Sequence, residues 1–171
     1  MNVIAREQLG FMEAVKLAWS RLTEMNGRSR RSEFWWAMLA FMICYWVLSM
    51  VVSVALPLLA AQIVSSLLML LVLPLTARRL QDGGHSKWWV VVAWVASTVS
   101  NIYMAVSPAM DALTSVNPDP EAVLGLYTDP VIIVCGLVSA VAGIATFVFC
   151  LMDGKPEANQ YGESPKYYTP Y

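Results

Sequence analysis

The longest stretch without a charged residue constrains this chain most. No Asp, Glu, Lys or Arg occurs from residue 35 to residue 77, a run of 43 residues. A helix of that length would extend about 65 Å, whereas about 20 residues cross a hydrocarbon core. The run must therefore fold back on itself. Pro57 fits the first turn of a second helix and disfavours helix at the residue before it. We therefore expect spans over residues 35–56 and 58–77, joined by a tight hairpin at Leu56-Pro57.

Two further uncharged runs, over residues 88–110 and 131–152, are each long enough for one more span. Both are rich in Val, which favours strands in water. In lipid, however, the backbone must satisfy its own hydrogen bonds, and only helices and closed barrels do so. The runs lack the alternation of barrel strands. The sequence therefore predicts an all-α integral membrane protein with four transmembrane helices, the last two over residues 88–106 and 131–152.

The composition supports a membrane protein. Hydrophobic residues make up 58% of the chain and charged residues 13%, against about 45–50% and about 25% in soluble domains. There are too few charges to coat a globular surface, which argues against a water-soluble enzyme and a disordered chain. The net charge of −1 gives no support for nucleic-acid binding. We expect a membrane domain over residues 35–152, an N-terminal segment over 1–34 and a tail over 153–171.

The basic residues predict the orientation. All eleven Lys and Arg residues lie in segments 1–34, 78–87 and 153–171, and none lies in the hairpin or in the loop over 107–130. That loop instead carries four acidic residues, namely Asp111, Asp119, Glu121 and Asp129. Because Lys and Arg concentrate on the cytoplasmic side, both termini and the 78–87 loop are expected there, with the 107–130 loop outside. Asp119-Pro120-Glu121 predicts the start of a short helix ending near Tyr127.

Residues 11–24 predict an amphipathic helix. Its apolar side chains recur every three or four residues on one face, and its charged ones occupy the other; the apolar set is Phe11, Val15, Ala18, Trp19 and Leu22. A helix of this kind directly before a span is expected in the membrane interface. Docking on the protein's own cytoplasmic loop is a compatible alternative. Asn26-Gly27 is expected to end it.

Two segments concentrate arginine and tryptophan, over residues 27–36 and 78–89. Tryptophan settles at the level of the headgroups, so the expected interfacial anchors are Trp35, Trp36, Trp88 and Trp89. Arginine binds phosphate and carboxylate through two parallel hydrogen bonds. The segments therefore either anchor the protein or bind a phosphate or an acidic partner. We expect Asp82 to pair with one of the arginines and Ser32 to cap the first span.

No residue pattern points to catalysis, a metal or a cofactor. The spans contain no ionisable Asp, Glu, Lys, Arg or His, which proton-coupled transporters usually place there. His85 is the only histidine and has no second ligand nearby. The three cysteines, Cys44, Cys135 and Cys150, lie within spans and form no CxxC. Gly136, Ala140 and Gly143 have the spacing of small residues at close helix contacts, within the bundle or between two copies.

Three motifs in order resemble one family. They are GR-x-x-R-x-EFWW before the first span, RRL-x-D-x-G-x-S-x-WW between the second and third, and N-x-(aromatic)-G-x-x-P in the tail. The matching residues are Gly27, Arg28, Arg31, Glu33, Phe34, Trp35, Trp36, Arg78, Arg79, Leu80, Asp82, Gly83, Ser86, Trp88, Trp89, Asn159, Tyr161, Gly162 and Pro165. This pattern resembles the bacterial inner-membrane family known as domain of unknown function 805. The chain departs from it at Gln81 and Lys87, where the family usually has histidine and glycine.

The charge argument places all three motifs on one side of the membrane, so we expect them to meet in one cluster, formed by Arg28, Arg31, Glu33, Arg78, Arg79, Asp82 and Asn159. The leading interpretation is a non-enzymatic protein whose basic cytoplasmic face binds anionic lipid headgroups or a protein partner. An oligomeric transporter or channel for small solutes is an alternative, which a cavity shared by Gln62 and Asn101 would favour. A membrane enzyme acting on a lipid phosphate is the third possibility.

Overall fold

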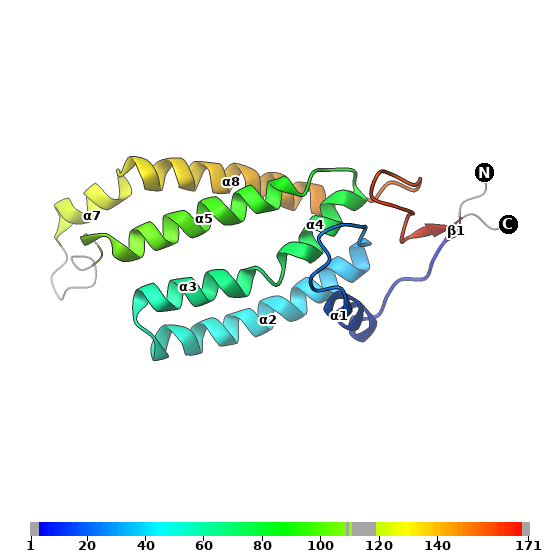
Figure 1. Ribbon diagram of the computed structural model, residues 1–171, viewed down its shortest axis with the longest axis horizontal. Helices are drawn as coiled ribbons and strands as arrows, with labels where there is room; N and C mark the ends of the chain where they lie inside the picture. The colour runs from blue at the N-terminus through cyan, green and yellow to red at the C-terminus, as the bar shows by residue number, and fades with distance from the viewer. Residues whose placement is uncertain (1–3, 109, 111–118, 169–171) are drawn as a thin grey trace.

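The protein is built from two pairs of long helices that join at one end. The computed structural model describes residues 4–108, 110 and 119–168. Helices α2 (Arg31–Ala55) and α3 (Leu58–Met69) form one pair, and α5 (Trp88–Val106) and α8 (Pro130–Leu151) form the other (Figure 1). The short helix α4 (Leu73–Asp82) lies where the pairs converge, near α1 (Phe11–Ser20). Helix α7 (Pro120–Tyr127) lies at the opposite end.

Four helical stretches are long and apolar enough to cross a membrane, as the uncharged runs predict. They are α2, α3 together with α4, α5, and α8. The hairpin lies where proline predicts it, because α2 ends at Ala55 and Pro57 directly precedes α3. Large apolar side chains such as Trp46, Val54 and Leu137 are exposed on the outer faces of these helices. Such faces are suited to contact with lipid, and the protein is a membrane protein by this criterion.

The second span is bent, whereas the sequence predicts one continuous span over residues 58–77. Between α3 and α4 the N–H groups of Leu70, Leu71 and Val72 donate to carbonyls three residues earlier, at 3.1 to 3.2 Å. Pro74 lies in the first turn of α4, and in a continuous helix its ring would clash with the carbonyl of Leu70. The chain therefore turns before the proline. Helix α4 then continues past residue 77 to Asp82, so Arg78 and Arg79 lie in a helix and not in a loop.

Helix α4 is buried along its whole length, although half of its residues are polar. Leu73, Leu75 and Leu80 join Phe34 of α2 and Cys150 of α8 in the hydrophobic core. The second half of α4 carries Arg78, Arg79, Gln81 and Asp82, which are also buried. Because α2, α5, α8 and the segments before α2 and after α8 contact it, α4 brings charged side chains into the protein interior.

Two helix ends differ from the prediction. Helix α1 ends at Ser20 and not near residue 24, because the carbonyls of Arg21 and Glu24 leave the helix and accept hydrogen bonds from the Arg78 guanidinium. Ser32 does not cap α2, whose N-cap residue is Arg30. Instead, the Ser32 hydroxyl accepts a hydrogen bond from the N–H of Leu9 at 3.3 Å.

The short helix predicted after Asp119 is confirmed. Helix α7 begins at Pro120, and the Asp119 carboxylate accepts a hydrogen bond from the N–H of Glu121 at 3.0 Å. Asp111 lies outside the described residues. At the other end of the molecule, strand β1 (Ile4–Ala5) pairs antiparallel with β2 (Tyr167–Tyr168). This pairing fixes the tail beside the N-terminal segment.

Candidate functional site

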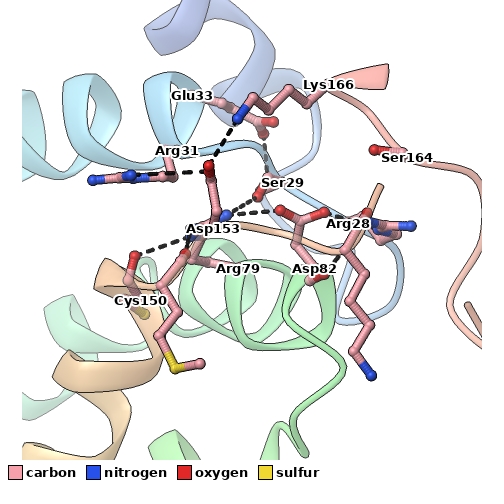
Figure 2. A network of polar contacts seen from close by, with 12 residues as sticks. Arg28, Ser29, Arg31, Glu33, Arg79, Asp82, Cys150, Asp153, Ser164 and Lys166 are labelled. Carbon is pink, nitrogen blue, oxygen red and sulfur yellow. Dashed lines mark hydrogen bonds and ion pairs between the residues drawn. The ribbon is translucent and has the colours of Figure 1, made fainter. Parts of the chain in front are cut away.

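The centre of the site is the carboxylate of Asp82, which two arginines share. Arg28 Nε donates to Oδ1 at 2.8 Å, and Arg79 Nη1 donates to Oδ2 at 2.7 Å (Figure 2). Asp82 is 2% exposed, Arg28 is 4% exposed and Arg79 is 1% exposed. Hydrogen bonds between ionised groups are strong in such surroundings. The carboxylate of Asp82 and the two guanidinium groups are therefore stable in the interior only when all three are present.

Arg79 joins α4 to the end of α8. Its Nε donates to the carbonyl of Cys150 at 3.1 Å, and its Nη2 donates to the carbonyl of Met152. The last carbonyls of a helix have no partner within it and carry partial negative charge. The guanidinium supplies both the missing donors and the matching charge.

Arg28 joins α4 to the tail. Its Nη1 donates to the carbonyls of Glu157 and Gly162 at 2.8 and 3.3 Å, and its Nη2 donates to the carbonyl of Lys155. The tail also contacts the backbone of α4, because the N–H of Lys155 donates to the Asp82 carbonyl at 3.1 Å. Asn159 Nδ2 donates to the carbonyl of Gln81 at 2.9 Å. The turn-rich tail is therefore fixed by contacts with one buried helix.

Arg78 forms a second buried pair, with Glu33 of α2. Its Nη2 lies 3.6 Å from Glu33 Oε1, and the two side chains are at most 1% exposed. The hydroxyl of Ser29 connects them, donating to Glu33 Oε1 at 2.7 Å and accepting from Arg78 Nε at 3.3 Å. Together with the carbonyls of Arg21 and Glu24, this pair attaches α4 to the turn between α1 and α2.

Six of the seven residues predicted for the cluster come together, namely Arg28, Glu33, Arg78, Arg79, Asp82 and Asn159. Arg31 lies at the edge, half exposed, with Nη1 3.9 Å from Asp153 (Figure 2). The cluster is not the basic surface that the sequence suggests. Arg28, Arg78 and Arg79 are buried, and the chain's own carboxylates and carbonyls accept their hydrogen bonds. Counting charges along the sequence cannot reveal those backbone acceptors.

Three residues of the network are missed by the sequence interpretation. Ser29 lies within the first arginine-rich segment, and Gln81 Nε2 donates to the carbonyl of Met25 at 3.1 Å. Gly154 is the third. A Cβ atom built on it would lie 1.9 Å from Asp82 Oδ2, so only glycine fits there. The turn-forming Asp153-Gly154 pair directly after the last span is the one sequence signal for it.

A second polar site lies beside the network. It is a hollow of about 370 Å³, named here the basic hollow and lined by Gln8, Arg30, Arg31, Ser32, Trp35, Asp153 and Lys166. Lys166 Nζ donates to Asp153 Oδ2 at 2.9 Å, and this bond holds the pKa of the Asp153 carboxyl below its usual range. Three cationic side chains thus face one carboxylate.

Arg30 is the unusual member of the basic hollow. It is 7% exposed, and the one hydrogen bond of its guanidinium within the described chain is a long one, from Nη2 to the carbonyl of Arg6 at 3.4 Å. No carboxylate of the described residues lies within ion-pair distance of it. The other three buried arginines each have an acidic partner or share one.

The histidine and the tryptophans divide between packed and exposed positions. The His85 ring is half-buried and stacks on Phe149, with ring centroids 3.8 Å apart, and burial together with Lys155 lowers its pKa. Trp36, Trp88 and Trp89 are exposed, and their role as interfacial anchors stays a prediction. Trp35 differs, because it packs inward, with its ring 6.2 Å from that of Phe147.

Comparison with protein families gives a match over most of the chain. Residues 22–163 match the family described as Protein of unknown function (DUF805), which confirms the resemblance seen in the three motifs. The matched range contains the whole buried network and both helix pairs. No curated protein and no solved structure matches the chain.

Replacing Gly154 by alanine tests the fit of the tail against Asp82. The new methyl group would overlap the Asp82 carboxylate, so one of the two arginine contacts must break, and we expect a loss of about 3 kcal/mol or more. Thermal unfolding in detergent measures this. Gly125→Ala is the control, because a Cβ there meets nothing within 4 Å and alanine favours helix. Equal unfolding temperatures for the two variants would contradict the geometry.

The stacked His85 predicts a pH dependence. Burial lowers the pKa of His85 below its ordinary 6.5, so the unfolded chain binds more protons than the folded one as pH falls towards and below that value. His85 therefore does not reduce the stability of the folded protein above pH 6.5, and it reduces that stability as the pH falls below this value. We expect the unfolding temperature to fall less between pH 7.5 and pH 5 in His85→Phe, which retains the stacking on Phe149. The same decrease in both proteins would show that the histidine does not contribute.

Proposed function

The chain belongs to the family described as Protein of unknown function (DUF805), and from that premise we propose a non-enzymatic, lipid-binding role in the bacterial inner membrane. The basic hollow binds the phosphate of an anionic lipid headgroup. The observation that carries this proposal is Arg30, a buried guanidinium without a carboxylate partner among the described residues. A protein partner with an acidic group in the same place is the related alternative.

A phosphate would satisfy several groups at the basic hollow together. A guanidinium held out of water without a counter-ion is energetically costly. Arg30 and Arg31 also occupy the N-cap and first position of α2, where the helix dipole is positive and a cation is unfavourable. The first N–H groups of the helix have no partner within it. An anion bound between the two arginines would accept hydrogen bonds from the free N–H groups of the helix and neutralise the charges of Arg30 and Arg31.

The charge balance near α4 also favours an anion. Four arginines are buried at this end of the protein, Arg28, Arg30, Arg78 and Arg79, but only two carboxylates, Glu33 and Asp82, are buried with them. The described interior therefore carries an excess of two positive charges. Cationic surfaces at a membrane attract anionic lipids, and an excess that is partly enclosed is screened less by salt.

The proposed orientation has both termini in the cytoplasm. The N-terminal segment, the connection after α4 and the tail all lie at one end of the bundle, and α7 and the α2–α3 hairpin lie at the other (Figure 1). Together with α4, which lies at the same end, these three segments contain every Lys and Arg, and basic residues favour the cytoplasmic side. In this orientation α1 lies in the membrane interface, with the exposed side chains of Met12 and Trp19 in contact with lipid.

Binding explains the basic hollow better than catalysis does. The one hydroxyl among its described lining residues, that of Ser32, already accepts a hydrogen bond from Leu9, and no general base of the described chain bonds to it. Asp82 and Glu33, the other candidates for acid–base chemistry, are enclosed in ion pairs. A hydrolytic reaction needs a positioned nucleophile and base. The proposal therefore includes no reaction on the lipid.

The transporter alternative has one supporting observation. Gln62 of α3 and Asn101 of α5 line a common cavity between the helix pairs, the arrangement that would favour a pathway for a small solute. The transporter alternative predicts that glycerol or another neutral solute enters liposomes that contain the protein faster than it enters empty liposomes. Lipid binding alone predicts equal rates of entry.

Two substitutions with opposite expected effects on lipid binding test the basic hollow. Arg30→Gln removes the unpaired cation, and we expect it to weaken binding of dioleoyl phosphatidylglycerol about tenfold, which corresponds to about 1.4 kcal/mol. Asp153→Asn removes the competing carboxylate and should strengthen binding. Native mass spectrometry of the protein with added lipid gives the dissociation constants.

The control is Lys16→Gln, which makes the same change of charge on an exposed residue of α1. It should leave binding within about twofold of the original. If Lys16→Gln weakens binding as much as Arg30→Gln does, the attraction is a general effect of net charge and the proposed site is wrong.

A further inference from the structure

A large cavity lies between the two helix pairs. Its volume is about 690 Å³, within the range of about 300–1,000 Å³ that small-molecule sites have. The N–H of the Trp94 indole donates to the carbonyl of Ser66 at 3.2 Å, which joins α5 to α3 on one side. On the other side α2 and α8 meet at Trp35 and Phe147, and the two helix pairs separate away from α4 (Figure 1). Trp35 thus lies between this cavity and the basic hollow.

The cavity contains polar side chains that the described part of the protein leaves without partners. Thr146 is the clearest case, because it is 9% exposed and its Oγ1 forms no hydrogen bond. No hydrogen bond within the described chain involves the side chains of Gln62, Ser65, Ser66, Thr98 or Asn101, which also line the cavity. Unsatisfied polar groups at membrane depth are costly. They indicate an occupant that can form hydrogen bonds.

The remaining lining defines the character of that occupant. No charged side chain of the described residues lines the cavity, so an ionised group there would have no counter-ion. Met38, Met42 and Met69 contribute much of the apolar wall, and methionine adapts to irregular apolar shapes. Val90 and Asn101 both line it along α5, a rise of about 17 Å. The occupant is therefore long, mostly apolar and uncharged.

We propose that this cavity binds one uncharged, single-chain lipid with a hydrogen-bonding head. The head meets Gln62 and Asn101, which lie about one turn from the ends of α3 and α5, and the chain extends between the helix pairs towards Trp35. This site differs from the basic hollow in ligand charge and in location, and its existence does not depend on the function proposed above.

Gly143 offers a direct way to fill the cavity. It lines the cavity, and a Cβ atom built on it meets nothing within 4 Å, so Gly143→Phe places a ring in the space of the lipid without a clash at Cβ. Gly136 on the same helix also has open space at Cβ but does not line the cavity. Gly136→Phe is therefore the matched control.

The experiment is native mass spectrometry of the full chain with added monoolein, a neutral single-chain lipid, and in parallel with oleate, its anionic counterpart. We expect one saturable monoolein per chain and at least tenfold weaker binding of oleate. Gly143→Phe should weaken monoolein binding at least tenfold, and Gln62→Leu, which adds no bulk, several-fold. Gly136→Phe should bind as the unmodified protein does.

Three results would overturn the proposal. Equal monoolein binding by Gly143→Phe and the unmodified protein would place the lipid elsewhere, and oleate binding as tight as monoolein would show that charge is not excluded. A stable dimer that Gly143→Phe converts to a monomer would identify a second copy of the chain as the occupant, through Gly136, Ala140 and Gly143. If Gly143→Phe does not fold, Gln62→Leu decides, since unchanged monoolein binding by that variant contradicts the assigned head position.

Discussion

The structure depends on one buried carboxylate that two arginines share. Asp82 receives Arg28 and Arg79 at 2.8 and 2.7 Å, and through them the end of α8 and the tail are attached to α4. Without Asp82, two guanidinium groups would lie buried without their counter-ion, which is far more costly than the pair is stabilising. The carboxylate also restricts the sequence of the tail, since only a glycine at position 154 leaves room beside it.

This network changes the functional interpretation of the arginines. Arg28, Arg78 and Arg79 bind the protein's own chain, so the anion site that we propose lies at the neighbouring basic hollow, with Arg30, Arg31 and Lys166. The same network closes one end of the bundle, and the helix pairs separate away from it. Two distinct environments result, a cationic hollow and an uncharged cavity, with Trp35 lining both. The proposed ligands follow from that difference in charge.

Much of the fold follows from the sequence because lipid permits few alternatives. Missing charges predict the four spans, Pro57 predicts the hairpin, and the three motifs predict the meeting of Arg28, Asp82 and Asn159. The bend before Pro74 and the burial of α4 are not predicted. A short polar segment between two spans resembles a solvated loop in the sequence, because the backbone groups that bind its side chains cannot be identified there. The acceptors of Arg79 are carbonyls of Cys150 and Met152, and a carbonyl has no signature in a sequence. Arg30 becomes a candidate anion-binding residue only when the structure shows that no carboxylate of the described chain pairs with it.

The most direct test of the central role of Asp82 is a double-mutant cycle with Arg28. The free energy of unfolding in detergent is measured for the unmodified protein, Asp82→Asn, Arg28→Met and the double variant. If the buried pair acts as one unit, each single change costs about 3–5 kcal/mol, and the double change costs less than their sum by at least about 1 kcal/mol. Single costs that add to within about 0.5 kcal/mol would show that the two residues act independently, and would contradict the account.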